Sequence, residues 1–142
     1  MFPEVAYRGL KSENELEEDK ITIGLNALND FRQSQRNTDK LELSINWDGE
    51  GSLNCLRNIE SDNFPGEKLF KIGYFKIKRS KLDALKGAFH GRAVGFDYEK
   101  APLENNIFHG NLLLNKNVNK GHKRTVLSAL LIDVCDSYES WE

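Results

Sequence analysis

The sequence predicts one α+β domain over residues 1–142, in which a mostly antiparallel, twisted sheet of four to five strands is packed by one long C-terminal helix and by short helices. Two observations predict this fold class. Residues 41–47 alternate strictly between apolar and polar side chains, as a half-buried strand does. Residues 122–138 repeat apolar side chains at spacings of three and four, which gives a helix a core-facing stripe.

Elements of the first half are read from short patterns. Residues 5–10 fit a strand or extended entry, 13–19 fit a solvated helical turn or loop, and 21–37 show no clean period. The strand over 41–47 points Leu41, Leu43, Ile45 and Trp47 to one face, so Trp47 should be buried. After the turn at 48–51, a short helix carries Leu53, Leu56 and Ile59.

The second half continues with strands and turns. Residues 69–78 form a strand whose apolar phase slips at Gly73, which predicts a β-bulge there. A brief helix then carries Leu82 and Leu85, and strands are expected over 92–98 and 107–114 on either side of a loop. The helix over 122–138 completes the sheet's packing.

Length and composition limit the class of protein. With 142 residues, 39% hydrophobic and 30% charged, the chain can bury an ordinary core without disulfides or metals. No apolar run approaches the ~18 residues of a membrane helix, and the N-terminus lacks the pattern of a secretory signal. Cys55 and Cys135 look like buried thiols. We therefore expect a cytoplasmic, bacterial-type protein with no membrane partner and no cofactor.

Charge is unevenly distributed along the chain. Residues 1–60 hold 7 basic and 12 acidic side chains, a net charge of −5, whereas 61–142 hold 13 and 10, a net charge of +3. The basic segment 67–92 offers a weak anion-binding face through Lys76, Lys78 and Lys81. Lysines that protect a sheet edge are the preferred explanation, so nucleic acid is the alternative partner and not the expected one.

Candidate chemistry concentrates between residues 90 and 111. Asp97 and Glu99 lie two apart on a strand, so their carboxylates point the same way, and His109 could serve as a general base. These three residues are the candidate catalytic set. Lys100 directly follows Glu99, unlike the Glu-x-Lys arrangement of restriction-type nucleases, and solvated carboxylates at a strand end explain the same pattern. No structural metal site is predicted.

Three further residues are candidates for binding. Arg8, early in the first strand, could grip a phosphate or carboxylate. Glu104 lies in the segment 104–106, whose first interpretation is turn chemistry after Pro102. Asn46 is the third candidate, and it enters through a family resemblance.

That resemblance rests on two stretches, Leu-Ser-Ile-Asn-Trp at 43–47 and the segment 94–113. Together they resemble a loose group of small uncharacterised bacterial proteins, with a Leu-Ser-x-Asn-Trp strand and a later Asp…Glu-Asn-Pro-x-His loop. The chain departs from this pattern at Asn106, where the group has Pro, and at Tyr98, where Pro usually follows the Asp. The group has no assigned activity. The resemblance implies that five residues act as a set: Asn46, Trp47, Asp97, Glu104 and His109.

The sequence thus favours a small cytoplasmic accessory or binding protein whose site surrounds the 97–109 loop and whose partner is a protein or a small molecule. The alternative is a small metal-dependent hydrolase or nuclease-type effector that uses Asp97, Glu99 and His109.

Overall fold

A computed structural model describes residues 2–17, 32–33, 40–84, 88–89, 92–93, 96–115 and 138–141. The strands are β1 (Val5–Leu10), β2 (Arg32–Gln33), β3 (Lys40–Trp47), β4 (Gly73–Lys78), β5 (Ala88–Phe89), β6 (Arg92–Ala93), β7 (Phe96–Lys100), β8 (His109–Asn115) and β9 (Glu139–Ser140). The helices are the 3₁₀ turn η1 (Glu13–Glu15) and the short α-helices α1 (Ser52–Arg57) and α2 (Arg79–Ala84). None of the described helices is long or apolar enough to cross a membrane.

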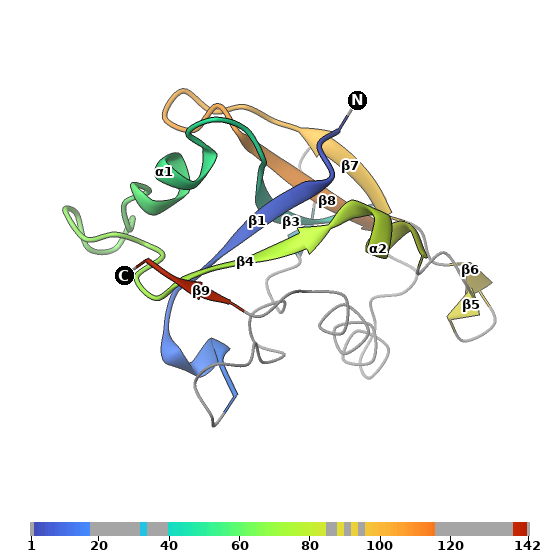
Figure 1. The fold of residues 1–142 in the computed structure, drawn as a ribbon, viewed down its shortest axis with the longest axis horizontal. Coiled ribbons are helices and arrows are strands. Elements are labelled where there is room, and N and C mark those ends of the chain that lie inside the picture. Colours follow the sequence, from blue (N-terminus) through green and yellow to red (C-terminus); the bar gives the residue numbers. More distant parts are fainter. Residues whose placement is uncertain are drawn as a thin grey trace.

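One antiparallel sheet organises these elements (Figure 1). Its strands follow the order β7-β8-β3-β1-β4-β9, β2 pairs with β3 outside this path, and β5 pairs with β6 separately. β3 and β8 form the longest ladder, from Lys40 opposite Asn115 to Asn46 opposite His109. The strands predicted over 5–10 and 41–47 are confirmed.

The predicted fold class is wrong in two respects. The sheet path has six strands, with β2 as a seventh, where four to five were expected. The described α-helices are both short, with six residues each, and none is the long packing helix that was expected. Of that helix, residues 122–137 lie outside the described residues. The strand count failed because short pieces such as β9 gain their hydrogen bonds from a distant partner, here β4, and carry little periodicity of their own.

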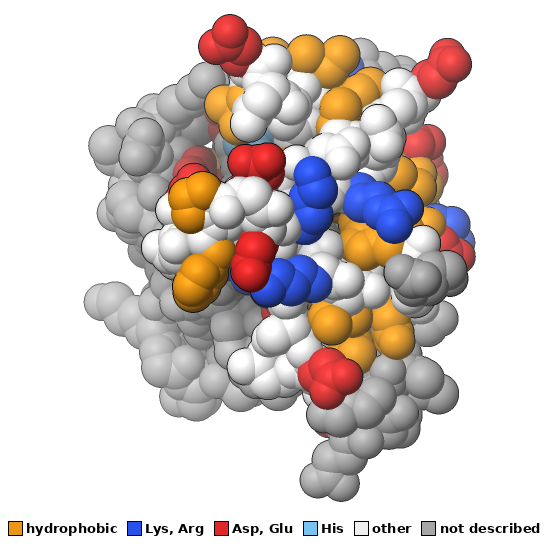
Figure 2. All heavy atoms as spheres, turned by 90° about the vertical axis from the view of Figure 1, so that its left-hand side faces the viewer, with side chains coloured by type: hydrophobic (Ala, Val, Ile, Leu, Met, Phe, Trp, Pro, Cys, Tyr) orange, Lys and Arg blue, Asp and Glu red, His pale blue; other side chains and the backbone are white. Residues whose placement is uncertain are grey.

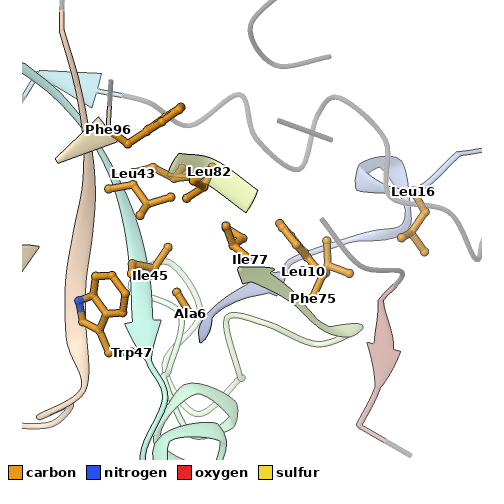
Figure 3. Packing of buried hydrophobic residues seen from close by; sticks show 11 residues of the cluster. Ala6, Leu10, Leu16, Leu43, Ile45, Trp47, Phe75, Ile77, Leu82 and Phe96 are labelled. Carbon is orange, nitrogen blue, oxygen red and sulfur yellow. The ribbon is translucent and has the colours of Figure 1, made fainter. Parts of the chain in front are cut away.

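Both faces of the sheet are covered by apolar side chains. The main core contains Ala6, Leu10, Leu16, Leu43, Ile45, Trp47, Phe75, Ile77, Leu82, Phe96 and Leu112 (Figure 3). The second core contains Tyr7, Leu56 and Phe70. Ala6 and Tyr7 are consecutive on β1 and belong to different cores, so β1 is buried on both faces. Trp47 is only 3% exposed, which confirms the predicted strand phase.

The sequence suggested a bulge at Gly73, and the structure places this residue at the start of β4. β4 begins at Gly73, so Phe70 and Ile72 precede the strand. Phe70 packs in the second core, whereas Phe75 and Ile77 pack in the main core. Gly73 is required for another reason: a Cβ there would lie 2.0 Å from the carbonyl oxygen of Glu139 on β9. Ile72 also packs against the main core, so the residues on either side of Gly73 reach the same core and only Phe70 lies in the second one.

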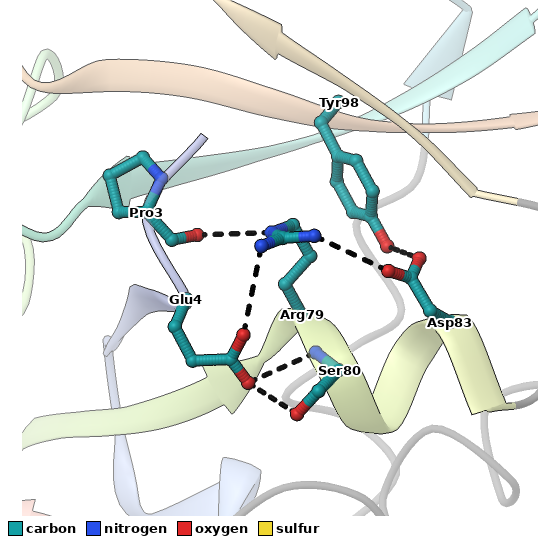
Figure 4. A network of polar contacts seen from close by, with 6 residues as sticks. All are labelled: Pro3, Glu4, Arg79, Ser80, Asp83 and Tyr98. Atoms are coloured by element: carbon teal, nitrogen blue, oxygen red, sulfur yellow. Dashed lines mark hydrogen bonds and ion pairs between the residues drawn. The ribbon is translucent and has the colours of Figure 1, made fainter. Parts of the chain in front are cut away.

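A polar network fixes α2 against the N-terminal segment and β7 (Figure 4). The Arg79 guanidinium lies 3.8 Å from the Glu4 carboxylate and 3.4 Å from that of Asp83. Glu4 also accepts hydrogen bonds from the backbone N–H and hydroxyl of Ser80, which lower its pKa. The Tyr98 hydroxyl donates to Asp83 at 2.5 Å, and burial together with this bond raises the pKa of Tyr98. The network secures one side of the strand that leads into the candidate loop.

Candidate functional site

The loop between β7 and β8 is held to the sheet by a buried pair of amides. The Asn46 side chain donates to Asn106 Oδ1 at 3.0 Å, and the Asn106 side chain donates to Asn46 Oδ1 at 2.7 Å. Asn46 is 1% exposed and Asn106 is 2% exposed. A buried amide without hydrogen-bond partners lowers the stability of the fold, so this reciprocal pair holds the loop against β3 at Asn46.

Backbone hydrogen bonds close the same loop. Leu103 and Asn106 exchange two bonds of 3.0 Å, and Ala101 donates to the carbonyl of His109 at 2.9 Å. The His109 Nδ1 lies 2.8 Å from the Ala101 carbonyl. Since a carbonyl oxygen only accepts, this contact assigns the proton to Nδ1. The loop is therefore a closed, hydrogen-bonded turn, and His109 has a fixed ring orientation.

Trp47 connects β7, the strand that precedes this loop, to the main core. Its indole N–H donates to the backbone carbonyl of Glu99 at 3.0 Å. Its ring packs against Phe2 at 5.0 Å and against Tyr98 at 5.9 Å, measured between centroids. Gly110 lies beside the indole, where a Cβ would approach the indole nitrogen to 2.3 Å and the Glu99 carbonyl to 2.4 Å. The close fit leaves no room for a side chain at this position of β8.

Arg8 lies where β1 and β3 stop pairing. The register pairs Ala6 with Trp47 and Tyr7 with Asn46. The next residue, Arg8, is 5% exposed, and its Nη1 donates to the carbonyl of Ser44 at 2.8 Å. The Arg8 side chain thus donates a hydrogen bond to a β3 carbonyl where the pairing of β1 with β3 ends. Arg8 therefore has a structural partner in the sheet, and the ligand-gripping role stays a prediction.

A hollow of about 40 Å³ brings several of these polar groups together. Its polar lining includes Arg8, Ser44, Asn46, Asn106 and His109. Leu56, Ile59 and Phe70 contribute apolar walls. The volume fits on the order of one or two water molecules, so this hollow has no room for a substrate beside its lining groups.

The acidic candidates lie elsewhere. Asp97 is exposed and forms an ion pair with Lys40 at 3.0 Å. Glu99 is half-buried on β7, and Glu104 is exposed in the loop. None of the three lines the 40 Å³ hollow. Within the described part of the chain, no three His, Cys, Asp or Glu side chains gather closely enough to hold a metal ion. The structure therefore unites Arg8, Asn46 and His109 but leaves the acidic residues outside.

The outer side of the loop presents a larger hollow of about 250 Å³. Its lining residues are Pro3, Trp47, Asp48, Lys100, Ile107, Phe108 and His109. Ile107 is 67% exposed, and Leu103, on the same loop, is 49% exposed. Two of the three large apolar side chains that are exposed in the described part of the chain therefore lie on this one loop.

Sequence reasoning missed two features. Asn106 was assigned to turn chemistry, although its side chain is buried against Asn46, 60 positions away in the chain. A basic hollow beside Trp141 was also missed, because its residues come from three separate segments.

Comparison of the chain with protein-family models, curated proteins and solved structures finds no match. The resemblance to the group of bacterial proteins stays a prediction.

Proposed function

We propose that this chain is a small accessory protein that binds a partner protein through the 101–109 loop. The observation that supports this most is the combination of a tightly bonded loop with exposed apolar side chains. Asn106 anchors the loop from inside, while Leu103 and Ile107 face water. A preformed loop loses little conformational entropy on binding, so its apolar contacts contribute more fully to affinity.

The chemistry of the outer hollow favours a peptide segment that carries an apolar side chain. Its lining includes the buried Trp47 and the half-buried Phe108, together with one exposed acidic and one exposed basic group, Asp48 and Lys100. Apolar contacts surrounded by groups of both signs suit a peptide, whose backbone supplies donors and acceptors together. The free thiol of Cys55 accords with the cytoplasmic location that we propose for this protein.

The hydrolase alternative receives no support from a specific contact. Asp97 pairs with Lys40, and His109 directs Nδ1 to a backbone carbonyl. The arrangement of these residues is explained by the sheet and by the loop. We therefore propose binding and not catalysis at this site.

The test uses short peptides selected from a display library against the full chain. Their affinities are then measured by calorimetry for the wild type, for Ile107→Asp and for Phe64→Asp. Phe64 is the matched control, because it is also a large exposed apolar residue, at 62%, and lies outside the loop. We expect Ile107→Asp to weaken binding by about tenfold or more and Phe64→Asp to leave it unchanged. Equal effects of the two substitutions, or selection of no peptide, would overturn the proposal.

A further inference from the structure

A third hollow, of about 390 Å³, lies on the side of the molecule that carries α1 and the C-terminal strand. Its lining residues are Arg57, Glu67, Lys68, Phe70, Lys71 and Trp141. Figure 2 views the molecule from this side and shows Lys and Arg side chains gathered beside hydrophobic ones. The volume lies in the range of small-molecule sites, about 300–1,000 Å³. Basic and aromatic groups thus share one concave surface.

Trp141 is held firmly at this surface. Its indole N–H donates to the carbonyl of Phe70 at 2.7 Å. The Arg57 guanidinium lies over the ring at 5.7 Å from the centroid, and Tyr74 packs on the ring at 5.0 Å. These contacts fix the ring in one orientation and keep Arg57 near it. Arg57 and Trp141 also line a neighbouring hollow of about 280 Å³, so the pair borders both cavities.

The charges around the 390 Å³ hollow are unbalanced. Three cations line it against one carboxylate, that of Glu67. Glu67 pairs with Lys71 at 3.0 Å, but both side chains are more than half exposed, and such pairs contribute little. Lys68 is exposed and forms no ion pair with any described residue. A ligand that enters this hollow therefore meets a net positive charge.

From this arrangement we infer that the hollow binds a nucleotide unit, whose phosphate lies against Arg57, Lys68 and Lys71 and whose base lies against Trp141. Guanidinium and ammonium groups are the usual partners of phosphate oxygens. Aromatic side chains next to such cations are the elements with which proteins hold unpaired bases. The inference is independent of the peptide-binding loop, because the two sites share no lining residue. It also places phosphate contacts away from Lys76, Lys78 and Lys81, where the sequence had suggested them.

The experiment compares three probes with the wild-type chain at low salt: AMP, adenosine and a single-stranded oligothymidine. Calorimetry gives the affinities, and the two indole N–H signals in a ¹H–¹⁵N spectrum give the location, because the chain has two tryptophans. We expect AMP and the oligonucleotide to bind and to shift the Trp141 signal while the Trp47 signal stays in place. Adenosine, which lacks the phosphate, should bind at least about tenfold more weakly than AMP.

Two matched charge reversals locate the phosphate contact. Lys68→Glu alters an exposed lysine in the hollow, and Lys81→Glu alters an exposed lysine on α2, outside it. We expect Lys68→Glu to weaken AMP binding by about tenfold and Lys81→Glu to change it by less than about twofold. Equal losses in both variants, no binding of AMP or oligonucleotide, or equal binding of adenosine and AMP would overturn the inference.

The salt dependence identifies the natural source of the nucleotide. If the oligonucleotide contacts all three cations, its log affinity should fall with log salt at a slope of about −2. A steeper slope and a higher affinity for the oligonucleotide than for AMP would assign the site to single-stranded nucleic acid. Equal affinities of AMP and of the oligonucleotide, each counted per binding site, would assign the hollow to free nucleotides. Either result supports a nucleotide site.

Discussion

Replacing either member of the Asn46–Asn106 pair tests whether this buried contact fixes the loop. Each single replacement by Ala removes the two hydrogen bonds of the pair, of 3.0 and 2.7 Å, and leaves the other amide buried without this partner. Asn46→Ala also removes the 3.3 Å bond from the Asn46 amide to the Ser52 carbonyl. Two such bonds contribute about 1–3 kcal/mol, and a buried unpaired amide adds about 1–3 kcal/mol. Both ranges include part of the hydrogen bonding that the remaining amide loses, so they cannot simply be added. We expect each variant to lose about 2–4 kcal/mol of unfolding free energy.

The double variant, Asn46→Ala with Asn106→Ala, separates the contact from general loss of packing. It removes the same two bonds once and leaves no unpaired amide, so its loss should be smaller than the sum of the single losses by about 1–3 kcal/mol. Urea denaturation followed by circular dichroism measures all four proteins. The neighbouring exposed residue supplies a control, Asn105→Ala, which should change stability by less than about 0.5 kcal/mol. Additive single losses would refute the reasoning, because independent residues show no coupling.

Three other perturbations follow from the same structure. Trp47→Phe keeps most of the ring contacts but removes the bond to the Glu99 carbonyl, so urea denaturation should show a loss of about 1–3 kcal/mol; an unchanged midpoint would contradict the buried indole. Gly110→Ala places a methyl group against the indole nitrogen and the Glu99 backbone and should cost about 2–3 kcal/mol by the same method, whereas a neutral effect would contradict this packing. Burial and the hydrogen bond to Glu139 raise the pKa of Tyr74 to about 12, so its stabilising contribution should be complete below about pH 10 and be lost as the pH rises toward 12. Urea midpoints across this range should therefore fall more steeply in the wild type than in Tyr74→Phe, and parallel curves would exclude the effect.

The part of the fold that the sequence could predict is the part with a strong local period. The alternation over 41–47 placed Trp47 in the core, and the structure agrees, because a strand with one buried face must alternate. β1 was harder to place: it lies between β3 and β4 and is buried on both faces, so its residues show no alternation to read. Phe70 gave a misleading phase, because it belongs to the second core.

The candidate site shows a similar limit for polar residues. Spacing correctly indicates that Asp97 and Glu99 share a strand, β7. It gives no information on Lys40, which reaches Asp97 from β3 and is 57 positions earlier in the sequence. A polar side chain takes its role from the partner that tertiary structure supplies, and such partners leave no periodic trace. The same reason hid the hollow at Trp141, which unites α1, the segment around Phe70 and the C-terminal residues.

Asn106 has a physical role that a Pro at the same position could not fill. Pro has neither a backbone N–H nor a side-chain amide. In this chain the Asn106 N–H donates to the Leu103 carbonyl at 3.0 Å, and the side chain exchanges two bonds with Asn46. A chain with Pro here could make neither this N–H bond nor the two side-chain bonds, and it would keep only the bonds that the backbone carbonyl of residue 106 accepts. It would need another way to fix the loop, such as the restricted φ of Pro itself. Asn106 therefore fixes the loop by tertiary contacts where Pro would restrict the backbone alone, and the position of the loop in this protein depends on its contact with β3.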